Sequence, residues 1–552
     1  MTDELKKEVI SRKTSLFEFK NFKKKKHSFK GRFCFYEMGK DWKLINVVLL
    51  GLGFMLVFTA FQTTSMVGKY VTNSVKQEKM ETPEFNETFV AFKEENYDEY
   101  KSMEDEIVQE AAEAEETDPS TYNATQRDAL VIEKMKSDLI DQQYGDGFTS
   151  MSIVYAVFAL SNFTAPAVVK LFGHKATMFV AGLTYLLYII TFLNPTPVFL
   201  YTASFTLGFG AAYIWTAQGD FLHLQSPDEK LMSRNTGIFW CMFQTSLLIG
   251  NIYIMIAWKG ESYVSSEMRT TLFTIFAILA SVGCSIFLLL KGKCCGPEER
   301  YNAVPVEEQE LQGENEKKTS EEEEPQGAIN TITSSIQAAF KLLVTKKMLL
   351  IAPLFMYSGF ELSYFSGVHP TTVGNSKNMA DSSSAVGMAG LFVGIGEVLG
   401  GGIFVFGAKM MENISRTKIL MGCCLLHIAA YALSLLNYSF SANLDPTDNP
   451  PSLGIFSETS RQVAIAIAFL LGLGDAGVNN VIYTSITKGF PEDTTSAFAL
   501  MKFIQSATCA LCFFISNSIN LFTTIAILLS FLFISVATFI PFMRSVTEPP
   551  NA

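Results

Sequence analysis

The stretch LFTTIAILLSFLFISVATFI, residues 521–540, is twenty residues long and contains no charged side chain. A helix of this length crosses the hydrocarbon core of a bilayer, which is about 30 Å thick. Similar runs recur along the 552-residue chain, in which 49% of residues are hydrophobic and 18% are charged. Soluble domains carry about 25% charged residues. The composition therefore predicts a polytopic membrane protein.

Twelve apolar runs of this kind follow one another, each about 20 residues long. They are arranged as six runs, a polar loop over residues 291–347, and six further runs. This order predicts an all-α membrane protein with twelve transmembrane helices. The runs begin near Leu44, Thr149, Ala176, Pro197, Gly237, Thr270, Met348, Ala385, Ile419, Val463, Ser496 and Leu521.

The orientation is predicted from charge. Residues 1–43 contain 13 Lys and Arg against 6 Asp and Glu, and no apolar segment typical of a cleavable signal peptide. Since Lys and Arg collect on the cytosolic side, this tail and, by the even helix count, the C-terminus are expected in the cytosol. Neither the plasma membrane nor an internal membrane is favoured. The expected domains are a basic tail (1–43), a first bundle (44–290), a cytosolic linker (291–347), a second bundle (348–541) and a C-terminal tail (542–552).

The loop between the first two runs, residues 69–147, contains 21 Asp and Glu against 8 Lys and Arg. It carries N-glycosylation sequons at Asn86 and Asn123, and the predicted orientation places both outside. High net charge with few apolar residues is typical of disorder. We expect a glycosylated, mostly disordered insertion with one amphipathic helix over 127–140. A vestibule that attracts cations or binds a partner is the alternative.

Other sequence features exclude several classes of protein. The net charge of −11 argues against a nucleic-acid partner. The nine cysteines lie in apolar runs or beside basic segments, so a disulfide scaffold is not expected. Cys294 and Cys295 follow the sixth run next to lysines, which predicts a palmitoylation site.

Seven strings in the apolar runs are distinctive. They are VFTAFQTT (57–64), YTASFTLGFGAAYIWTAQGD (201–220), RNTGIFW (234–240), YSGFELSYFSG (357–367), GEVLGG (396–401), GLGDAGVNN (472–480) and SAFALMKFIQS (496–506). Together they resemble the Unc-93-like branch of the major facilitator superfamily. The resemblance covers all twelve runs and implies two six-helix bundles around a central cavity, built from inverted repeats.

The resemblance implies two classes of function. The wider superfamily contains secondary carriers, whereas this branch includes a potassium-channel regulator and a trafficking chaperone for nucleic-acid-sensing receptors. The long first loop departs from the family. The superfamily's glycine–aspartate–arginine gate motif is also missing, because residues 170–175 contain no acid and no arginine. We expect a carrier of a small solute, and one form of this hypothesis couples the transport to protons or cations. The alternative is an accessory protein that acts on a channel or another membrane protein.

Ionisable residues inside the apolar runs are the candidate functional groups, because a charge at the bilayer centre costs at least about 2.5 kcal/mol. Two interpretations are open: a cavity with carboxylates that take up protons or cations, or polar groups that hold helices together. Three acids lie deep in the second half, and Lys502 lies about two turns into its helix, where it can pair with one of them or extend toward the cytosol. The acids are Glu361, Glu397 and Asp475, and the neutral polar groups of the first half are Gln62, Asn162, Gln218, Gln244 and Asn251.

One string invites an enzymatic interpretation. Residues 472–475, Gly-Leu-Gly-Asp, match a signature of intramembrane aspartyl proteases, but that chemistry needs a second aspartate and the run near Ile419 has none. Cys509 and Cys512 have CxxC spacing within an apolar run, where core thiols are expected. We therefore expect no enzyme, no cofactor and no metal. The expected partners are the lipid bilayer and either a small solute or another membrane protein, with no nucleic acid.

Overall fold

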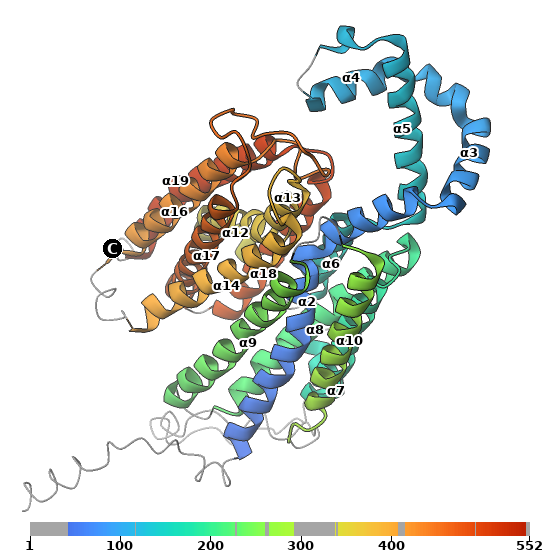
Figure 1. Ribbon diagram of the computed structural model, residues 1–552. Coiled ribbons are helices and arrows are strands. Elements are labelled where there is room, and N and C mark those ends of the chain that lie inside the picture. Colours follow the sequence, from blue (N-terminus) through green and yellow to red (C-terminus); the bar gives the residue numbers. More distant parts are fainter. Residues whose placement is uncertain are drawn as a thin grey trace, which may run out of the picture. The chain divides into compact units, whose positions relative to one another are not determined.

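The computed structural model (Figure 1) describes residues 42–115, 118–226, 229–259, 264–291, 337, 341–406, 414–491 and 493–547. The chain divides into two compact units, Met1–Ile45 and Asn46–Ala552. Within the first unit the structure describes residues 42–45, which begin a helix. Most of the predicted basic tail and of the predicted linker lies outside the described residues.

Each of the twelve predicted runs begins in a helix of its own, and the run from Thr149 continues past the end of α6 into α7. Capping side chains fix several helix starts, because Thr345, Ser415 and Ser460 each accept a hydrogen bond from the N–H three residues later. The helices are α2 (Trp42–Met80), α6 (Gly147–Ser161), α7 (Ala165–Thr191), α8 (Pro197–Leu224), α9 (Glu229–Ala257), α10 (Ser266–Phe287), α12 (Lys346–Ser363), α14 (Ser382–Phe406), α16 (Arg416–Asn437), α17 (Arg461–Gly489), α18 (Thr494–Ile515) and α19 (Leu521–Thr547). A π-helical turn, η4 (Tyr364–Val368), and α13 (His369–Asn375) continue α12.

Among the described residues, ten helices are each long and apolar enough to cross a membrane. Helices α6 and α7 pass that test together, as a pair bent by 97°, which gives eleven spans if the pair counts as one. Inside α7 the backbone of Gly173 has φ 76° and ψ 158°, a conformation that glycine adopts most readily. This break lies in the loop without the gate motif. Twelve spans therefore stays a prediction, which requires α6 and α7 to supply two spans divided at Gly173.

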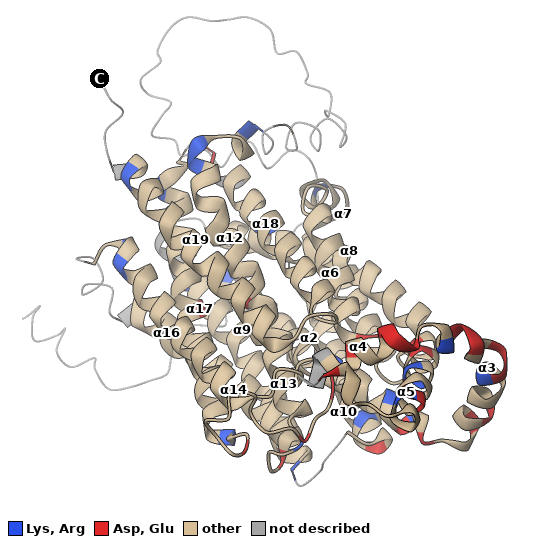
Figure 2. Cartoon of the chain, turned by 90° about the horizontal axis from the view of Figure 1, so that it is seen from above, with Lys and Arg blue, Asp and Glu red and all other residues tan. Residues whose placement is uncertain are grey.

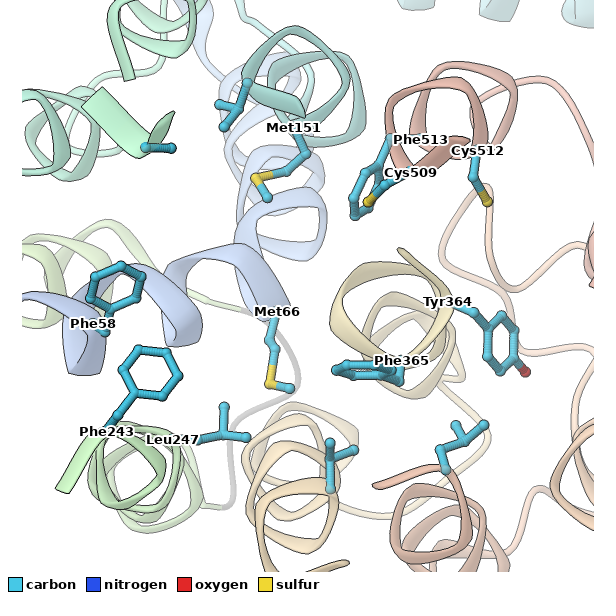
Figure 3. Packing of buried hydrophobic residues seen from close by; sticks show 14 of the residues in the cluster. Phe58, Met66, Met151, Phe243, Leu247, Tyr364, Phe365, Cys509, Cys512 and Phe513 are labelled. Carbon is cyan, nitrogen blue, oxygen red and sulfur yellow. The ribbon is translucent and has the colours of Figure 1, made fainter. Parts of the chain in front are cut away.

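The helices pack as two halves joined by two pairs of helices. In the first half α7 packs on α8 and α10, and in the second α17 packs on α14 and α16. Among the described residues, the most extensive contacts between the halves are those of α9 with α14 and of α6 with α18. A single buried apolar cluster includes residues of both halves, and Figure 3 shows Met66 of the first half and Phe365 of the second within it.

The segment between α2 and α6 is folded, so the prediction of a mostly disordered insertion is wrong. It forms α3 (Pro83–Ser102), α4 (Glu104–Glu115), a short turn η1 (Pro119–Thr121) and α5 (Ala124–Gln143), called here the three-helix module. Helix α5 confirms the predicted amphipathic helix. Figure 2 shows the acidic residues, coloured red, gathered on the module. Its buried core, which the acidic composition concealed, consists of Phe85, Phe89, Ile107, Val131, Met135, Leu139 and Ile140.

The module is joined directly to the first membrane helix. Helix α2 runs to Met80, so about twelve residues of the predicted loop continue the helix of the first span. Lys76 of α2 pairs with Asp141 of α5 at 2.6 Å, and Arg269 of α10 pairs with Glu78 of α2 at 3.2 Å. These ion pairs fasten the module to α2 and α2 to α10.

Candidate functional site

The predicted acids of the second half meet where α14 and α17 are in backbone contact. A Cβ atom at Gly472 would lie 2.1 Å from the carbonyl oxygen of Val393, and one at Gly396 would lie 2.5 Å from a main-chain oxygen of α17. The glycines therefore allow an approach that any side chain would prevent. This approach places Glu397 of α14 close enough to Asp475 of α17 for the two carboxyl groups to interact.

Glu361 of α12 is fully buried and interacts with Asp475. The two side chains are within hydrogen-bonding reach of each other, and such a bond requires one carboxyl group to carry a proton. With both groups ionised, neither oxygen of Glu361 accepts a hydrogen bond from the described residues. Asp475, by contrast, accepts from Asn479 Nδ2 at 2.8 Å. Glu361 is thus the acid whose hydrogen-bonding capacity is unmet.

A histidine that sequence reasoning missed links Glu361 to two tyrosines. His427 of α16 is fully buried, and its Nε2 lies 3.3 Å from the carbonyl oxygen of Leu471 and 3.5 Å from Glu361 Oε1. Both atoms are acceptors, so Nε2 carries the hydrogen and Nδ1 accepts from the Tyr357 hydroxyl at 2.6 Å. The Tyr431 hydroxyl donates to Tyr357 at 3.1 Å. A lone histidine in an apolar run was the signal that could have indicated this network.

Gly474 makes room for this histidine. A Cβ atom there would lie 2.1 Å from His427 Nε2, so the imidazole occupies the space that a side chain would fill. The Gly-Leu-Gly-Asp string therefore has a packing explanation: Gly472 admits the backbone of α14, and Gly474 admits the imidazole ring.

Among the described residues, one hydrogen bond connects the first half to these acids. Gln244 Nε2 of α9 donates to Glu397 Oε2 at 3.0 Å. The amide oxygen points away from the carboxylate and is buried without a donor among the described residues. On the other side, Lys502 is close enough to Asp475 to act on it electrostatically, and it donates to Gln505 Oε1 at 3.2 Å.

The other predicted polar groups lie elsewhere. Gln62 accepts from a serine of α9 at 2.6 Å, while Asn251 and Asn162 donate to main-chain oxygens one turn earlier, at 2.8 and 2.9 Å. Asn162 ends α6 instead of lying within it. Gln218 is buried on α8, and no hydrogen bond joins it to the acids in the described part of the chain. The fold thus brings Gln244 to the acids and leaves these four groups apart.

The predicted modification sites stay predictions. Asn86 and Asn123 are exposed on the module, and Asn123 also caps the start of α5. Cys294 and Cys295 lie outside the described residues.

A second polar contact between the halves, also missed by sequence reasoning, is called here the clamp and consists of Lys69, Asp146 and Asn517. Lys69 of α2 pairs with Asp146, which caps α6, and donates to Asn517 Oδ1 at 2.9 Å. Asn517, which follows α18, donates to Asp146 Oδ1 at 2.6 Å. Burial alone would raise the pKa of Asp146, but Lys69 and Lys76 outweigh that effect, and the pKa lies well below its usual range.

Two packed halves joined by α9–α14 and α6–α18 define the transporter fold of the major facilitator superfamily. The nucleoside transporter NupG has a similar structure, with a TM-score of 0.52 and 13% identity over 92% of this chain and 100% of that one. A POT family transporter in complex with a thioalcohol-conjugated peptide gives a TM-score of 0.58 and 11% identity over 92% and 96%. These likenesses confirm the predicted fold class.

Within this class, the chain belongs to the UNC-93 family. Residues 138–540 match the family described as ion channel regulatory protein UNC-93. The UNC93-like protein MFSD11 of Xenopus laevis is 32% identical over 503 residues, which cover 90% of this chain and 95% of the relative. UNC93-like protein 3 of Arabidopsis thaliana is 25% identical over 403 residues, 69% of this chain and 76% of the relative. The predicted resemblance is confirmed, and the protein is an integral multi-pass membrane protein.

Proposed function

We propose that this protein is a secondary carrier that moves a small solute together with a proton or a cation. Glu361 carries the proposal, because its carboxyl group is fully buried beside Asp475, its oxygens accept no hydrogen bond among the described residues, and His427 Nε2 stays 3.5 Å away. An unpaired buried charge costs several kcal/mol. Binding of a proton or a cation removes that cost, so the site is suited to a cycle of binding and release.

His427 supports a proton as the coupled ion. It lies 3.5 Å from Glu361 and 2.6 Å from the Tyr357 hydroxyl, which in turn lies 3.1 Å from Tyr431. Imidazole can accept a proton on one nitrogen and release it from the other. In this proposal, His427 and the two tyrosines pass a proton to and from Glu361.

Gln244 supports coupling of the acids to the motion of the two halves. Its amide donates to Glu397 across the α9–α14 contact, and a hydrogen bond to an ionised carboxylate is about twice as strong as one to a neutral group. Protonation at Glu397 therefore weakens a link between the halves. In carriers with this fold, the halves rock about a site between them.

Transport by proteoliposomes tests the proposal. Solutes that stabilise the purified protein against heat are assayed for uptake driven by a pH gradient. We expect Glu361→Gln to abolish the coupled uptake and Glu267→Gln, an exposed acid of α10, to leave it unchanged. If Glu361→Gln, Glu397→Gln and Asp475→Asn all retain the uptake, the carboxylate mechanism is wrong.

We also propose that both termini and the linker face the cytosol and that the module faces the opposite side. The support is the basic tail and the exposure of both sequon asparagines, Asn86 and Asn123, on the module. A glycosidase that shortens the wild-type protein, but not the Asn86→Gln/Asn123→Gln double variant, supports this orientation. If the wild-type protein carries no glycan when it is made in cells that glycosylate proteins, the proposed orientation is wrong.

An accessory role is the second candidate. The family's description as an ion channel regulator and the folded acidic module, which offers an ordered surface for a partner, favour it. Proximity labelling from the module in native membranes would identify a channel or another membrane protein at stoichiometric yield. Absence of any such partner contradicts this role.

A further inference from the structure

An aromatic cluster in the first half lies near Glu397. Phe58 of α2, Trp215 of α8 and Phe243 of α9 pack edge to face, with ring centroids 5.1–5.2 Å apart, and Figure 3 shows Phe58 and Phe243 as neighbours. Trp240 stacks on Trp215 with centroids 6.1 Å apart and planes 21° apart. Phe58 and Phe243 are almost fully buried, whereas Trp240 is 41% exposed. The cluster thus ends in an accessible indole face.

Trp240 lies on the face of α9 that contacts α14. Cβ atoms added at three glycines of α14 would lie within 3 Å of Met255, Asn251 and Leu248, which are one turn apart on α9. Gln244 continues this face and reaches Glu397. Trp240 precedes Gln244 by four residues, so it lies on the same face, about 6 Å further along the helix.

Open space begins where this contact ends. Gly401 follows Glu397 by four residues on α14, and a Cβ atom there would meet no atom of the described residues within 4 Å. The same holds for Gly237, three residues before Trp240 on α9. Since α9 and α14 run antiparallel through this contact, Gly401 and Trp240 occupy corresponding positions. In the described part of the chain, space is therefore open at Gly401 and Gly237, next to the positions of Glu397, Gln244 and Trp240.

The charges around this space favour a cation. Glu397 borders it and interacts with Asp475, which interacts with Glu361, and among the described residues the basic group that acts on these acids is Lys502, through Asp475. The electron-rich face of an indole attracts cations, and carboxylates with aromatic rings form the sites that recognise ammonium groups. A neutral or anionic solute would gain nothing from this combination.

We propose that this space binds an organic cation, an alkyl- or arylammonium ion, between the carboxylate of Glu397 and the indole of Trp240. This inference rests on the proposed carrier function and specifies its class of substrate. Glu397 supplies the opposite charge, Trp240 and Trp215 supply the π faces, and Gln244 holds the carboxylate in place. Trp240 is then a residue that determines specificity.

Binding to the purified full-length protein tests the inference. The probes are two matched pairs: choline with its neutral tert-butyl isostere, and phenethylammonium with phenethyl alcohol. We expect the cation of at least one pair to change the tryptophan fluorescence and raise the melting temperature, and its neutral partner to do neither. Failure of both cations to bind, or equal binding by the neutral partners, overturns the inference.

Variants assign the binding to these residues. Trp240→Leu and Glu397→Gln should each weaken binding of the cation about tenfold, while Trp240→Tyr, which keeps a ring, should retain it. Phe205→Leu, an exposed aromatic on another face of α8, is the matched control and should bind as wild type. Wild-type affinity in Trp240→Leu overturns the assignment, and normal binding by Trp240→Tyr excludes misfolding as the cause of a loss.

Transport separates this inference from the proposed function. If neutral or anionic solutes drive coupled proton movement while no cation binds, the carrier function holds and the substrate class is wrong. If the cations bind but no solute moves protons, the cation site stands and the carrier function fails.

Discussion

Two of the polar contacts between the halves, the clamp and the contact at Glu397, differ in how fully their charges are matched. At the clamp, Lys69, Asp146 and Asn517 pair a cation, an anion and an amide whose groups satisfy one another. Around Glu397 the described residues make one hydrogen bond between the halves, from Gln244, and the oxygens of the neighbouring Glu361 accept none. A contact whose charges are matched stabilises one arrangement of the halves. A contact with unmatched carboxylates changes when a proton or a cation binds to them.

Glu361→Gln should cause the largest change, because it removes the group that we propose takes up the proton. Loss of a positioned acid or base lowers rates by about a thousandfold, and we expect coupled uptake in proteoliposomes to fall by that order. The amide preserves the shape of the side chain, so the melting temperature should change little. If Glu361→Gln retains uptake within a few-fold of wild type, Glu361 takes no part in the proposed coupling.

Asp146→Asn should break the clamp and leave Lys69 largely buried without its charge partner. Removing one partner of such a pair costs about 3 kcal/mol of unfolding free energy, while the double variant Lys69→Met/Asp146→Asn should lose less. The Lys69 and Asp146 side chains are 11% and 13% exposed, so solvent screens the pair weakly. Thermal unfolding in a double-mutant cycle measures the coupling, and additive effects would show that the clamp stabilises nothing.

Gly474→Ala tests the packing beneath the unmatched contact. Its Cβ atom would lie 2.1 Å from His427 Nε2, so the imidazole must move at a cost of about 2 kcal/mol. Gly422→Ala on α16 is the control, because a Cβ atom there meets nothing within 4 Å among the described residues. In thermal unfolding, Gly474→Ala should be less stable than Gly422→Ala. Equal stability would mean that the imidazole of His427 has room to move.

The clamp should be insensitive to mild acid, which is the smallest effect expected. Because the pKa of Asp146 lies well below its usual range, its stabilisation persists until the pH falls below the ordinary range of aspartate. The difference in melting temperature between wild type and Asp146→Asn should therefore be the same at about pH 7.5 and pH 5. A difference that shrinks at pH 5 would show that Asp146 is protonated there.

Local patterns in the sequence predicted the parts of the structure that depend on local chemistry. Hydropathy located every long membrane helix, and depth along those helices indicated Glu361, Glu397 and Asp475. The fold brings those acids together through glycine contacts such as Gly472, whose effect depends on which helix faces it.

Contacts between distant residues could not be predicted in the same way. Lys69 and Asn517 are 448 residues apart, and nothing near either residue in the sequence indicates the other. The module was mistaken for disordered chain because net charge outweighed a few apolar residues at helical spacing. Ion pairs such as Lys101 with Glu104 and Arg127 with Glu104 offset part of that charge in the folded module.

The length of α2 makes it a lever arm. Its 39 residues extend about 58 Å, roughly twice the hydrocarbon thickness of a bilayer. Because the helix is unbroken, a tilt of about 10° inside the membrane displaces its far end by about 5 Å. The module at that end therefore amplifies any movement of the first half, and a spectroscopic distance between the module and the second half would report the proposed transport cycle.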